Sequence, residues 1–496
     1  MPRLLAVVLL SLSMAALNLA AAEPLRVGSK RFTESYILAQ LIAQVAQTAT
    51  PHNPVEVRAG LGNTAIVYAA LQAGSIDCYP EYSGTIAQQI LHLEGPVSLE
   101  TLNAALRPLG LGAALPFGFS NGYALALRDE RAAQLGIHQL SQLAGHPELR
   151  LGLSNEFIGR ADGWVGLAKR YGLKQQPIGL DHGLAYQALA KNQVDAIDIY
   201  TTDARIGQLG LRVLADDAAY FPRYDALLLY RLDLPQKHPA AWAALQRLAG
   251  SIDEKTMIAL NARAELRGVG FEQIAREHLA GSSSALASAG FAAKLLGPDL
   301  LPLTLQHLGL VLAGVGLGAL VGLPLALLAA PRPWWRALLL GGGALMQTVP
   351  SLALLAVLIA LLGRIGTLPA LLALALYALL PILHNACAGL AGVPAGQRLA
   401  ARALGLTPLQ SLRHVELPQA LPVILAGLRS ATTIAVGTAT IAAFIGAGGY
   451  GERIVTGLAL NDAQLMLAGA LPSAALALLF EGLFAGLTRL TAQSRA

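Results

Sequence analysis

Five long apolar segments in the second part of the chain limit the folds that are open to it. Residues 300–496 contain no lysine, ten arginines and only four acidic residues. The apolar segments lie at about 303–330, 337–362, 368–391, 419–446 and 463–488, and each can cross a bilayer at about 1.5 Å per helical residue. The sequence therefore predicts an all-α polytopic membrane domain of five spans over residues 299–496.

The N-terminus has the pattern of a secretory signal peptide. A basic start at Arg3 precedes an apolar stretch and then Ala20-Ala21-Ala22, which fits an A-x-A cleavage site. We expect residues 1–22 to be a signal peptide, with an uncleaved anchor as the alternative. In both cases the following segment leaves the cytoplasm.

The distribution of arginines between the loops indicates the same membrane topology. With the first span running inward, seven of them fall in inside loops or the C-terminal tail: Arg332, Arg336, Arg398, Arg402, Arg413, Arg489 and Arg495. Only Arg364 and Arg453 fall in outside loops, as the positive-inside rule requires. The net charge of +5 therefore reflects membrane topology, and we expect no nucleic-acid partner.

Residues 23–280 mix charged and apolar positions, as a water-soluble domain does. Short strands alternate with helices from Leu25 onward, which favours a parallel α/β sheet with a ligand crevice at the carboxyl ends of its strands. Helix N-termini near Thr33, with Thr33 as the N-cap, and near Thr64 and Thr85 should open on that crevice and favour a carboxylate.

Four tyrosines in turn-like contexts beside apolar strands are candidates for binding a cation. A quaternary ammonium group has no N–H to donate, so aromatic faces must recognise it. The candidates are Tyr82, Tyr123, Tyr200 and Tyr224. Their spacing alone is also compatible with ordinary core or rim tyrosines.

An inside loop carries a motif of known spacing. It runs from Leu399 through Arg402 to Gly405 and, after nine residues, continues as Val-Glu-Leu-Pro. This resembles the cytoplasmic coupling loop of ABC importer permeases, although Leu399 stands where that family usually has glutamate. The resemblance implies two short helices that turn at the glycine, end at a proline before span four, and dock on an ATPase. The expected docking residues are Ala400, Ala401, Gly405, Leu417 and Pro418.

The first half carries motifs of its own: Gly-Ser-Lys-Arg-Phe-Thr-Glu (28–34), Glu-Tyr-Ser-Gly-Thr (81–85), Asn-Glu-Phe (155–157), Arg-Ala-Asp-Gly (160–163) and Tyr-Thr-Thr-Asp (200–203). These resemble the glycine betaine/carnitine/choline-binding proteins of ABC importers. The resemblance implies an α/β two-lobed fold with a second lobe at about 120–222, and a cage formed by the four tyrosines. Thr85, Ser29 and Ser35 would be polar ligand contacts, Ser35 in place of a common glutamine. Arg160 could hold a carboxylate or form an interlobe or surface ion pair.

Other features carry no chemistry of their own. Residues 281–298 are predicted to be a flexible linker. Gly118-Phe119-Ser120-Asn121-Gly122 fits G-x-S-x-G, but a strand is expected after it where a nucleophile elbow needs a helix. Cys78 lies in the water-soluble half and Cys387 in a membrane segment, so the two are not expected to form a disulfide. The cysteines also lack the spacing of metal ligands. We expect no enzyme activity, cofactor or metal.

Together these patterns predict one subunit of an ABC importer in the inner membrane, with its binding domain in the periplasm. Its partners would be a small quaternary-ammonium solute such as glycine betaine, choline or carnitine, a second permease copy, and a separate ATPase, because the chain has no phosphate-binding loop. One alternative is import of another betaine-like zwitterion such as ergothioneine. A different alternative is a membrane-anchored ligand sensor.

Overall fold

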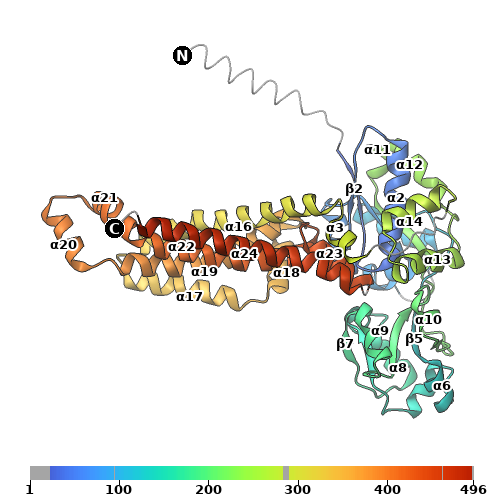
Figure 1. The fold of residues 1–496 in the computed structure, drawn as a ribbon. Coiled ribbons are helices and arrows are strands. Elements are labelled where there is room, and N and C mark those ends of the chain that lie inside the picture. Colours follow the sequence, from blue (N-terminus) through green and yellow to red (C-terminus); the bar gives the residue numbers. More distant parts are fainter. Residues whose placement is uncertain (1–22, 94, 96, 283–289, 461, 494–496) are drawn as a thin grey trace.

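The computed structural model describes residues 23–493 apart from 94, 96, 283–289 and 461, so the predicted signal peptide lies outside the described residues. Figure 1 shows an elongated helical bundle with two α/β units at one end. The short helices α20 (Ala395–Ala403) and α21 (Pro408–Ser411) lie at the opposite end, near the C-terminus. The predicted two-lobed α/β fold followed by an all-helical region is confirmed.

The first α/β unit is built on a five-stranded sheet in the order β2-β1-β3-β10-β4. Strand β1 pairs in parallel with β2 and β3, whereas β10 runs antiparallel between β3 and β4. Its strands are β1 (Leu25–Gly28), β2 (Val55–Arg58), β3 (Cys78–Tyr82), β4 (Leu111–Ala114) and β10 (Ala226–Arg231). Its helices are α2 (Thr33–Ala49), α3 (Thr64–Gln72), α4 (Ser83–Thr85), the π-turn η1 (Ile86–Ile90), α5 (Leu99–Leu106), η2 (Arg107–Leu109), α11 (Leu234–Lys237), α12 (Pro239–Leu245), η4 (Gln246–Leu248), α13 (Glu254–Glu265) and α14 (Phe271–Leu279).

Helix α2 is the central helix of this unit. Helices α12, α13 and α14 pack on it, and its apolar side chains are buried against β1 and β3. The prediction that Thr33 is its N-cap is wrong. Thr33 is already the first helical residue, and the extended residue before it is Phe32, whose side chain does not cap the helix.

The second unit has the sheet order β7-β6-β8-β5-β9. Strand β6 pairs in parallel with β7 and β8, and β5 runs antiparallel to β8 and β9. Its strands are β5 (Tyr123–Arg128), β6 (Leu151–Ser154), β7 (Ile178–Leu180), β8 (Ala196–Tyr200) and β9 (Leu211–Val213). Its helices are α6 (Asp129–Leu135), η3 (Leu140–Gly145), α7 (Asn155–Gly159), α8 (Trp164–Tyr171), α9 (His182–Ala190) and α10 (Arg205–Gln208). The chain therefore enters this unit after β4 and returns to the first unit at β10.

Among its described residues, the helical region contains four single helices that are long and apolar enough to cross a membrane. These are α16 (Leu300–Ala329), α19 (Thr367–Ala391), the helical run Pro408–Ala439 that contains α22 (Leu417–Ala439), and α24 (Ala463–Gln493), of which Ala463–Thr488 passes the test. The short helices η6 (Ile441–Ile445) and α23 (Gly451–Leu460) join α22 to α24. Tight packing of α16 on α19 uses Gly314, Gly318 and Gly322, each of which faces an α19 side chain or carbonyl.

The second predicted span, 337–362, is not one straight helix. It consists of α17 (Pro333–Thr348) and α18 (Ser351–Leu362), which meet at 100°. The break falls at Pro350, which has no N–H to continue the helical hydrogen-bond ladder and holds the residue before it in an extended conformation. The region thus has five candidate spans if the bent pair counts as one.

Two charged side chains lie on membrane-spanning helices, where 44% of the Arg429 side chain and 34% of the Glu481 side chain remain exposed. Arg429 of α22 and Glu481 of α24 form an ion pair, and Thr433 Oγ1 lies 3.5 Å from the same carboxylate. An isolated charge at this depth is costly, and the pairing lowers that cost. Cys78 and Cys387 are both free and buried, so they do not pair.

The predicted linker ends in a short helix. Residues 283–289 lie outside the described residues, but α15 (Phe291–Leu295) packs against α24, where Lys294 pairs with Asp462. Arg453 of α23 is buried and holds both carboxylate oxygens of Asp299 at 2.8 Å. Arg453 also donates to the carbonyl of Leu295. The segment that leads into α16 is therefore fixed to the helical region.

The coupling motif folds largely as expected. Ala400 and Ala401 lie in α20, and Gly405 turns the chain with a φ of 74°, a value that glycine adopts without strain. The expectation that Pro418 ends the second helix is wrong. Pro418 lies in the first turn of α22, just after Leu417, and the π-turn η5 (Leu412–Glu416) makes the helix continuous. Inside this continuous run the missing N–H of Pro418 removes one helical hydrogen bond, and the π-turn directly before it marks where the α-helical bond pattern is interrupted.

Candidate functional site

The two α/β units meet at a crevice where three of the four candidate tyrosines converge. Tyr123 opens β5 and Tyr200 ends β8, and the antiparallel register pairs these two residues directly. Their ring centroids lie 5.1 Å apart. Tyr224, on the segment that returns to the first unit, places its ring edge-on to Tyr123 at 5.9 Å. All three side chains are buried, so the sheet register and the chain crossing together create an aromatic cluster.

Tyr82 reaches this cluster through Phe32, a residue that the sequence reasoning did not assign to the site. Tyr82 ends β3 in the first unit, and the Phe32 ring lies 6.2 Å from its ring and 5.1 Å from that of Tyr200. The only signal in the sequence was the position of Phe32 inside the Lys-Arg-Phe-Thr-Glu motif. These rings from both units form one aromatic surface, and the Phe157 ring stacks on Tyr123 at 5.1 Å.

A buried lysine lies beside this surface and was also missed. The Lys30 ammonium is 5.1 Å from the Tyr82 ring centroid and 5.7 Å from that of Phe32. It pairs with Glu81 at 2.5 Å, and both side chains are almost fully buried. The Lys30 ammonium lies over the faces of these two rings, so the rings are placed to interact with a positive charge.

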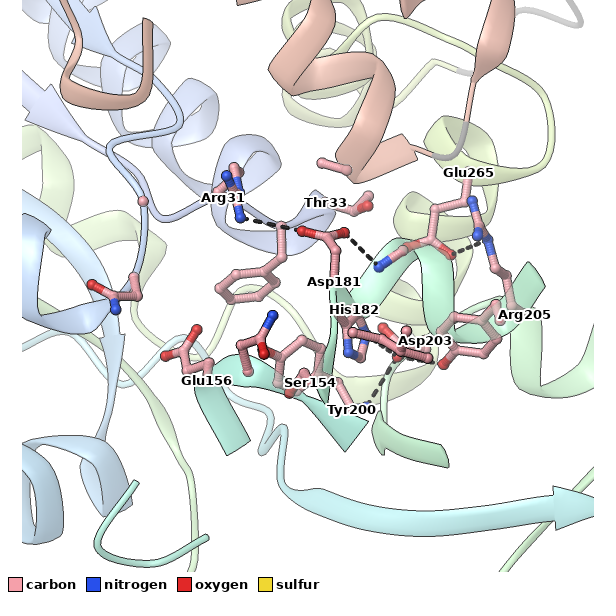
Figure 2. Close-up of a pocket in the computed structure, with 18 residues that line it drawn as sticks. Arg31, Thr33, Ser154, Glu156, Asp181, His182, Tyr200, Asp203, Arg205 and Glu265 are labelled. Atoms are coloured by element: carbon pink, nitrogen blue, oxygen red, sulfur yellow. Dashed lines mark hydrogen bonds and ion pairs between the residues drawn. The ribbon is translucent and has the colours of Figure 1, made fainter. Parts of the chain in front are cut away.

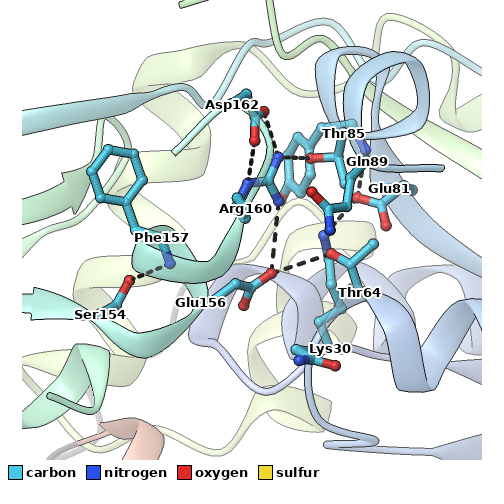
Figure 3. A network of polar contacts seen from close by, with 12 residues as sticks. Lys30, Thr64, Glu81, Thr85, Gln89, Ser154, Glu156, Phe157, Arg160 and Asp162 are labelled. Carbon is cyan, nitrogen blue, oxygen red and sulfur yellow. Dashed lines mark hydrogen bonds and ion pairs between the residues drawn. The ribbon is translucent and has the colours of Figure 1, made fainter. Parts of the chain in front are cut away.

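Arg160 links the two units in the network of Figure 3. It donates from Nε and Nη2 to the two oxygens of Asp162 at 2.7 and 2.6 Å, and from Nη2 to Thr85 Oγ1 at 3.2 Å. Its guanidinium also lies 4.9 Å from the Tyr123 ring centroid. The ion-pair partners of Arg160, Asp162 and Glu156, lie in its own unit, and its contact with the other unit is the hydrogen bond to Thr85.

Ser29 and Ser35 are brought near the site but point their hydroxyl oxygens at backbone. Ser29 Oγ accepts the Gly60 N–H at 2.8 Å, and Ser35 Oγ accepts the Lys30 N–H at 2.8 Å. Both side chains are fully buried. In this geometry they hold the loop that carries Lys30 and Phe32 instead of lining the aromatic cluster.

A buried carboxylate lies behind the aromatic cluster. Glu34 accepts hydrogen bonds from Tyr82 Oη at 2.5 Å, Asn121 Nδ2 at 3.0 Å, Thr202 Oγ1 at 2.6 Å and Asn261 Nδ2 at 3.2 Å. Burial raises the pKa of the Glu34 carboxyl, and the four donated hydrogen bonds oppose that shift. Because the donors come from β3, from the first chain crossing, from the turn after β8 and from α13, this group joins both units beside the cage tyrosine Tyr82.

A cavity of about 220 Å³ adjoins the cluster at Tyr200 and Phe32, as Figure 2 shows. Charged or titratable side chains also line the cavity: Arg31, Glu156, Asp181, His182, Asp203, Arg205 and Glu265. The His182 ring lies 4.4 Å from the ring of Tyr200, and its Nε2 is 3.0 Å from Asp203. The cavity therefore offers both signs of charge beside an aromatic wall, as a zwitterion requires.

Two charged groups of this cavity, His182 and Glu265, have pKa values that depart from the usual ones. Burial alone would lower the pKa of His182, but Asp203 and Asp198 outweigh that effect and raise it to about 10. Burial raises the pKa of Glu265 to about 7, helped by Asp203 and opposed by Arg205. His182 is therefore cationic at neutral pH and balances the carboxylates around it.

The arrangement suits binding rather than covalent chemistry. The G-x-S-x-G segment leads into strand β5, not into a helix, so Ser120 is not a nucleophile elbow. Among the described residues no group of three or more His, Cys, Asp or Glu side chains could hold a metal ion. Aromatic faces and fixed charges are groups that can recognise a charged ligand.

Comparisons with known proteins agree with this geometry. Residues 23–281 match the substrate binding domain of ABC-type glycine betaine transport systems, and residues 322–493 match the inner membrane component of binding-protein-dependent transport systems. A glycine-betaine-binding protein of Pseudomonas aeruginosa is 34% identical over 282 residues, which cover 53% of this chain and 89% of that protein.

Two further relatives cover different parts of the chain. An osmoprotectant import permease protein of Salmonella typhimurium is 43% identical over 185 residues, which cover 36% of this chain and 86% of that protein. An ergothioneine transport permease/ergothioneine binding protein of Helicobacter pylori is 32% identical over 253 residues, 49% of this chain and 45% of that protein. The chain therefore belongs to the ABC-type glycine betaine transport family, in which it joins a substrate-binding domain and an inner-membrane permease domain in one polypeptide.

Proposed function

We propose that the chain captures quaternary-ammonium solutes such as glycine betaine, choline or carnitine in the periplasm and passes them through its own permease domain. The observation that carries this proposal is the buried group of tyrosines at the crevice, Tyr82, Tyr123, Tyr200 and Tyr224, with Phe32 among them. A methylated ammonium has no hydrogen-bond donor, so aromatic faces are the groups that can select it over water.

The anionic end of the solute needs donors near the cage. Arg160 is buried, lies beside Tyr123 and has a bidentate partner in Asp162. A solute carboxylate could take the place of that partner with the same geometry. We assign Arg160 and Thr85 to this end, with Ser29 and Ser35 supporting the loop that carries Lys30.

The direction of transport follows from the two ends of the molecule. The coupling helices α20 and α21 lie at the end of the bundle opposite the binding domain (Figure 1). The predicted signal peptide and the unequal distribution of arginines between the loops support a periplasmic binding domain and a cytoplasmic coupling loop. Residues 281–298 would then join the binding domain to the permease domain over 299–496.

A separate ATPase subunit would drive the cycle. Leu399, Leu404 and Leu409 of the coupling loop are 63%, 81% and 74% exposed, which fits a surface that another protein covers. Two identical permease domains would form one pathway, each with its own ATPase contact at Ala400, Gly405, Leu417 and Pro418. Ala401, also expected at this contact, is 2% exposed and would instead support α20 from inside the chain. The chain itself would hydrolyse nothing.

Ergothioneine is the second candidate solute, because a relative that is 32% identical bears that name. Ergothioneine is itself a trimethylated betaine, so the same cage could hold its ammonium group. The two candidates differ in the bulk that the adjoining cavity must hold. Competition between labelled choline and each solute separates them directly.

Calorimetric titration of the purified full chain in lipid nanodiscs tests the proposal. The ligands are glycine betaine, choline, carnitine, proline betaine and ergothioneine, with 3,3-dimethyl-1-butanol as the uncharged carbon isostere of choline. Tyr200→Ala and Tyr82→Ala should each weaken binding by about 0.5–2 kcal/mol, the value of one cation–aromatic contact. Tyr68→Ala, on α3 outside the aromatic cluster, is the matched control. Unchanged affinity in both cage variants, or equal binding of the uncharged isostere, would refute a cage for cations.

A further inference from the structure

The exposed side of α16 suits contact with lipid. It presents large apolar side chains along the helix, among them Leu305, Leu312 and Leu320, which are 61%, 56% and 72% exposed. Leucine is among the side chains that enter a bilayer most favourably. This side of the permease domain can therefore face the acyl chains directly.

Helix α22 exposes residues of a different kind. Ala426, Ser430 and Gly437 are exposed and Thr433 is partly exposed. Successive positions in this set are four, three and four residues apart, so all of them lie on one side of the helix. Small and hydroxyl-bearing residues allow water or another helix to approach closely. We call Ala426, Ser430, Thr433 and Gly437 the polar face of α22.

An ion pair adjoins the polar face. Arg429 pairs with Glu481 of α24, and Thr433 Oγ1 lies 3.5 Å from the same carboxylate. The two charged side chains are 44% and 34% exposed, so the helices of one chain do not enclose them. Arg429 follows Leu417, the first residue of α22, by twelve residues, or about 18 Å at about 1.5 Å per residue. This depth is near the middle of a hydrocarbon core about 30 Å thick.

Charges at this depth need a cover other than lipid. Ionisable side chains within spans face protein or a water-filled cavity, because contact with acyl chains is costly for them. The cover that fits here is a second copy of this chain. A face with both signs of charge is complementary to its own copy across a two-fold axis, and the small residues beside it leave room for water.

We propose that Arg429 and Glu481 form a transit site for zwitterionic solutes, on a face that a second copy of this chain covers across a water-lined gap. This inference rests on the proposed function, since it takes a quaternary-ammonium zwitterion as the cargo. The Glu481 carboxylate receives the methylated ammonium. The Arg429 guanidinium holds the solute carboxylate through two parallel hydrogen bonds, and Thr433 offers a hydroxyl beside them.

The charges of this site stay balanced with and without solute. When the site is empty, the two side chains neutralise each other. When a zwitterion lies between them, each side chain faces one opposite charge, so no uncompensated charge remains within the membrane. Choline has no carboxylate and leaves Arg429 without a partner once Glu481 faces the ammonium. The transit site should therefore favour zwitterions over simple cations.

Cysteine labelling in membrane vesicles from cells that produce the full chain tests whether the polar face meets water. The reagent is (2-trimethylammonium)ethyl methanethiosulfonate, which carries a permanent charge. Native Cys78 and Cys387 are both buried, so the wild type gives the background. Ser430→Cys should react about ten-fold faster than Leu320→Cys, the matched control on the exposed side of α16. Equal rates in the two variants would overturn the water-lined gap.

Uptake of radiolabelled solutes by intact cells tests the two charges. Arg429→Met with Glu481→Leu removes both together, so no uncompensated charge is left in the membrane. Arg332→Gln is the matched control, because Arg332 is an exposed arginine that precedes α17 and lies on no span. Cells that lack the chain give the residual uptake, and immunoblots of the membranes correct for the amount of each variant.

We expect the double variant to take up glycine betaine about ten-fold more slowly than the wild type, and Arg332→Gln to match the wild type. A pair that only stabilises the fold predicts normal uptake by the double variant, so normal uptake overturns the transit site. Arg429→Gln alone should slow glycine betaine more than choline, and an equal loss would overturn the role of Arg429. If the wild type takes up no more solute than cells without the chain, the proposed function fails, while the labelling rates still decide whether the polar face meets water.

Discussion

Replacing the buried carboxylate of Glu34 by an amide should destabilise the binding domain more than its small change in shape suggests. Four side chains donate to the two oxygens of Glu34: Tyr82 and Asn121 to one, and Thr202 and Asn261 to the other. A glutamine at this position has one acceptor oxygen and one NH₂ group. The hydroxyls of Tyr82 and Thr202 can rotate to accept, but an asparagine NH₂ on the wrong side cannot.

The magnitude follows from those contacts. One buried donor left without an acceptor costs about 1–3 kcal/mol, and the remaining bonds each weaken from the charged to the neutral value by about 1 kcal/mol. Relief from burying a charge offsets part of this, because burial disfavours the ionised form and raises the pKa of Glu34. We expect a net loss of about 2–4 kcal/mol in the free energy of unfolding.

Thermal unfolding of the full chain, followed by intrinsic fluorescence, measures the effect. A loss of this size lowers the Tm of the transition that belongs to the binding domain by roughly 5–12 °C. Glu56→Gln is the matched control, because Glu56 lies in an exposed ion pair with Arg58, which is worth about 1 kcal/mol or less. If Glu34→Gln shifts the Tm no further than Glu56→Gln does, Glu34 is not an ionised acceptor and the reasoning fails.

Two further predictions concern charge. Because the pKa of His182 is raised to about 10, its ion pair with Asp203 contributes fully below the ordinary histidine pKa near 6.5 and is lost as the pH rises toward 10. Between pH 7.5 and 10, above the Glu265 pKa of about 7, the Tm of the wild type should fall more steeply than that of His182→Asn, and parallel curves would contradict the ion pair. In the membrane region, Arg429→Met leaves Glu481 uncompensated and should cost about 3 kcal/mol, whereas Arg429→Met with Glu481→Leu should recover most of it. The Tm in nanodiscs checks this, and a double variant no more stable than the single one would show that the two charges do not pair.

Much of the architecture could be predicted because it follows from local patterns. Apolar length marked the membrane region, and the alternation of strands and helices marked the α/β units. The 100° bend between α17 and α18 was missed, although Pro350 stands at the break. Proline also occurs inside unbroken spans here, as Pro324 does in α16, so its presence alone does not locate a bend.

The candidate site was predictable only in part. The order of the tyrosines in their motifs pointed to the crevice, and the pairing of β5 with β8 brings Tyr123 and Tyr200 together. Which way a side chain of a loop points depends on contacts that are distant in sequence. Ser29 turns to the Gly60 N–H, and Lys30 turns to Glu81, 51 residues away, so neither orientation could be read from the motif.

The fixed helix α15 sets a limit on how far the binding domain can travel. Seven residues separate Ser282 from Gly290 in the sequence, and seven residues cannot reach further than about 25 Å, at about 3.5 Å per residue. A freely diffusing binding protein can be present in excess over its permease, so that several loaded copies compete for one permease. In this chain the ratio of binding domains to permease domains is fixed at one to one, because both belong to the same polypeptide. Uptake capacity should therefore scale with the copy number of this single polypeptide, and overproduction of a detached binding protein should not increase it.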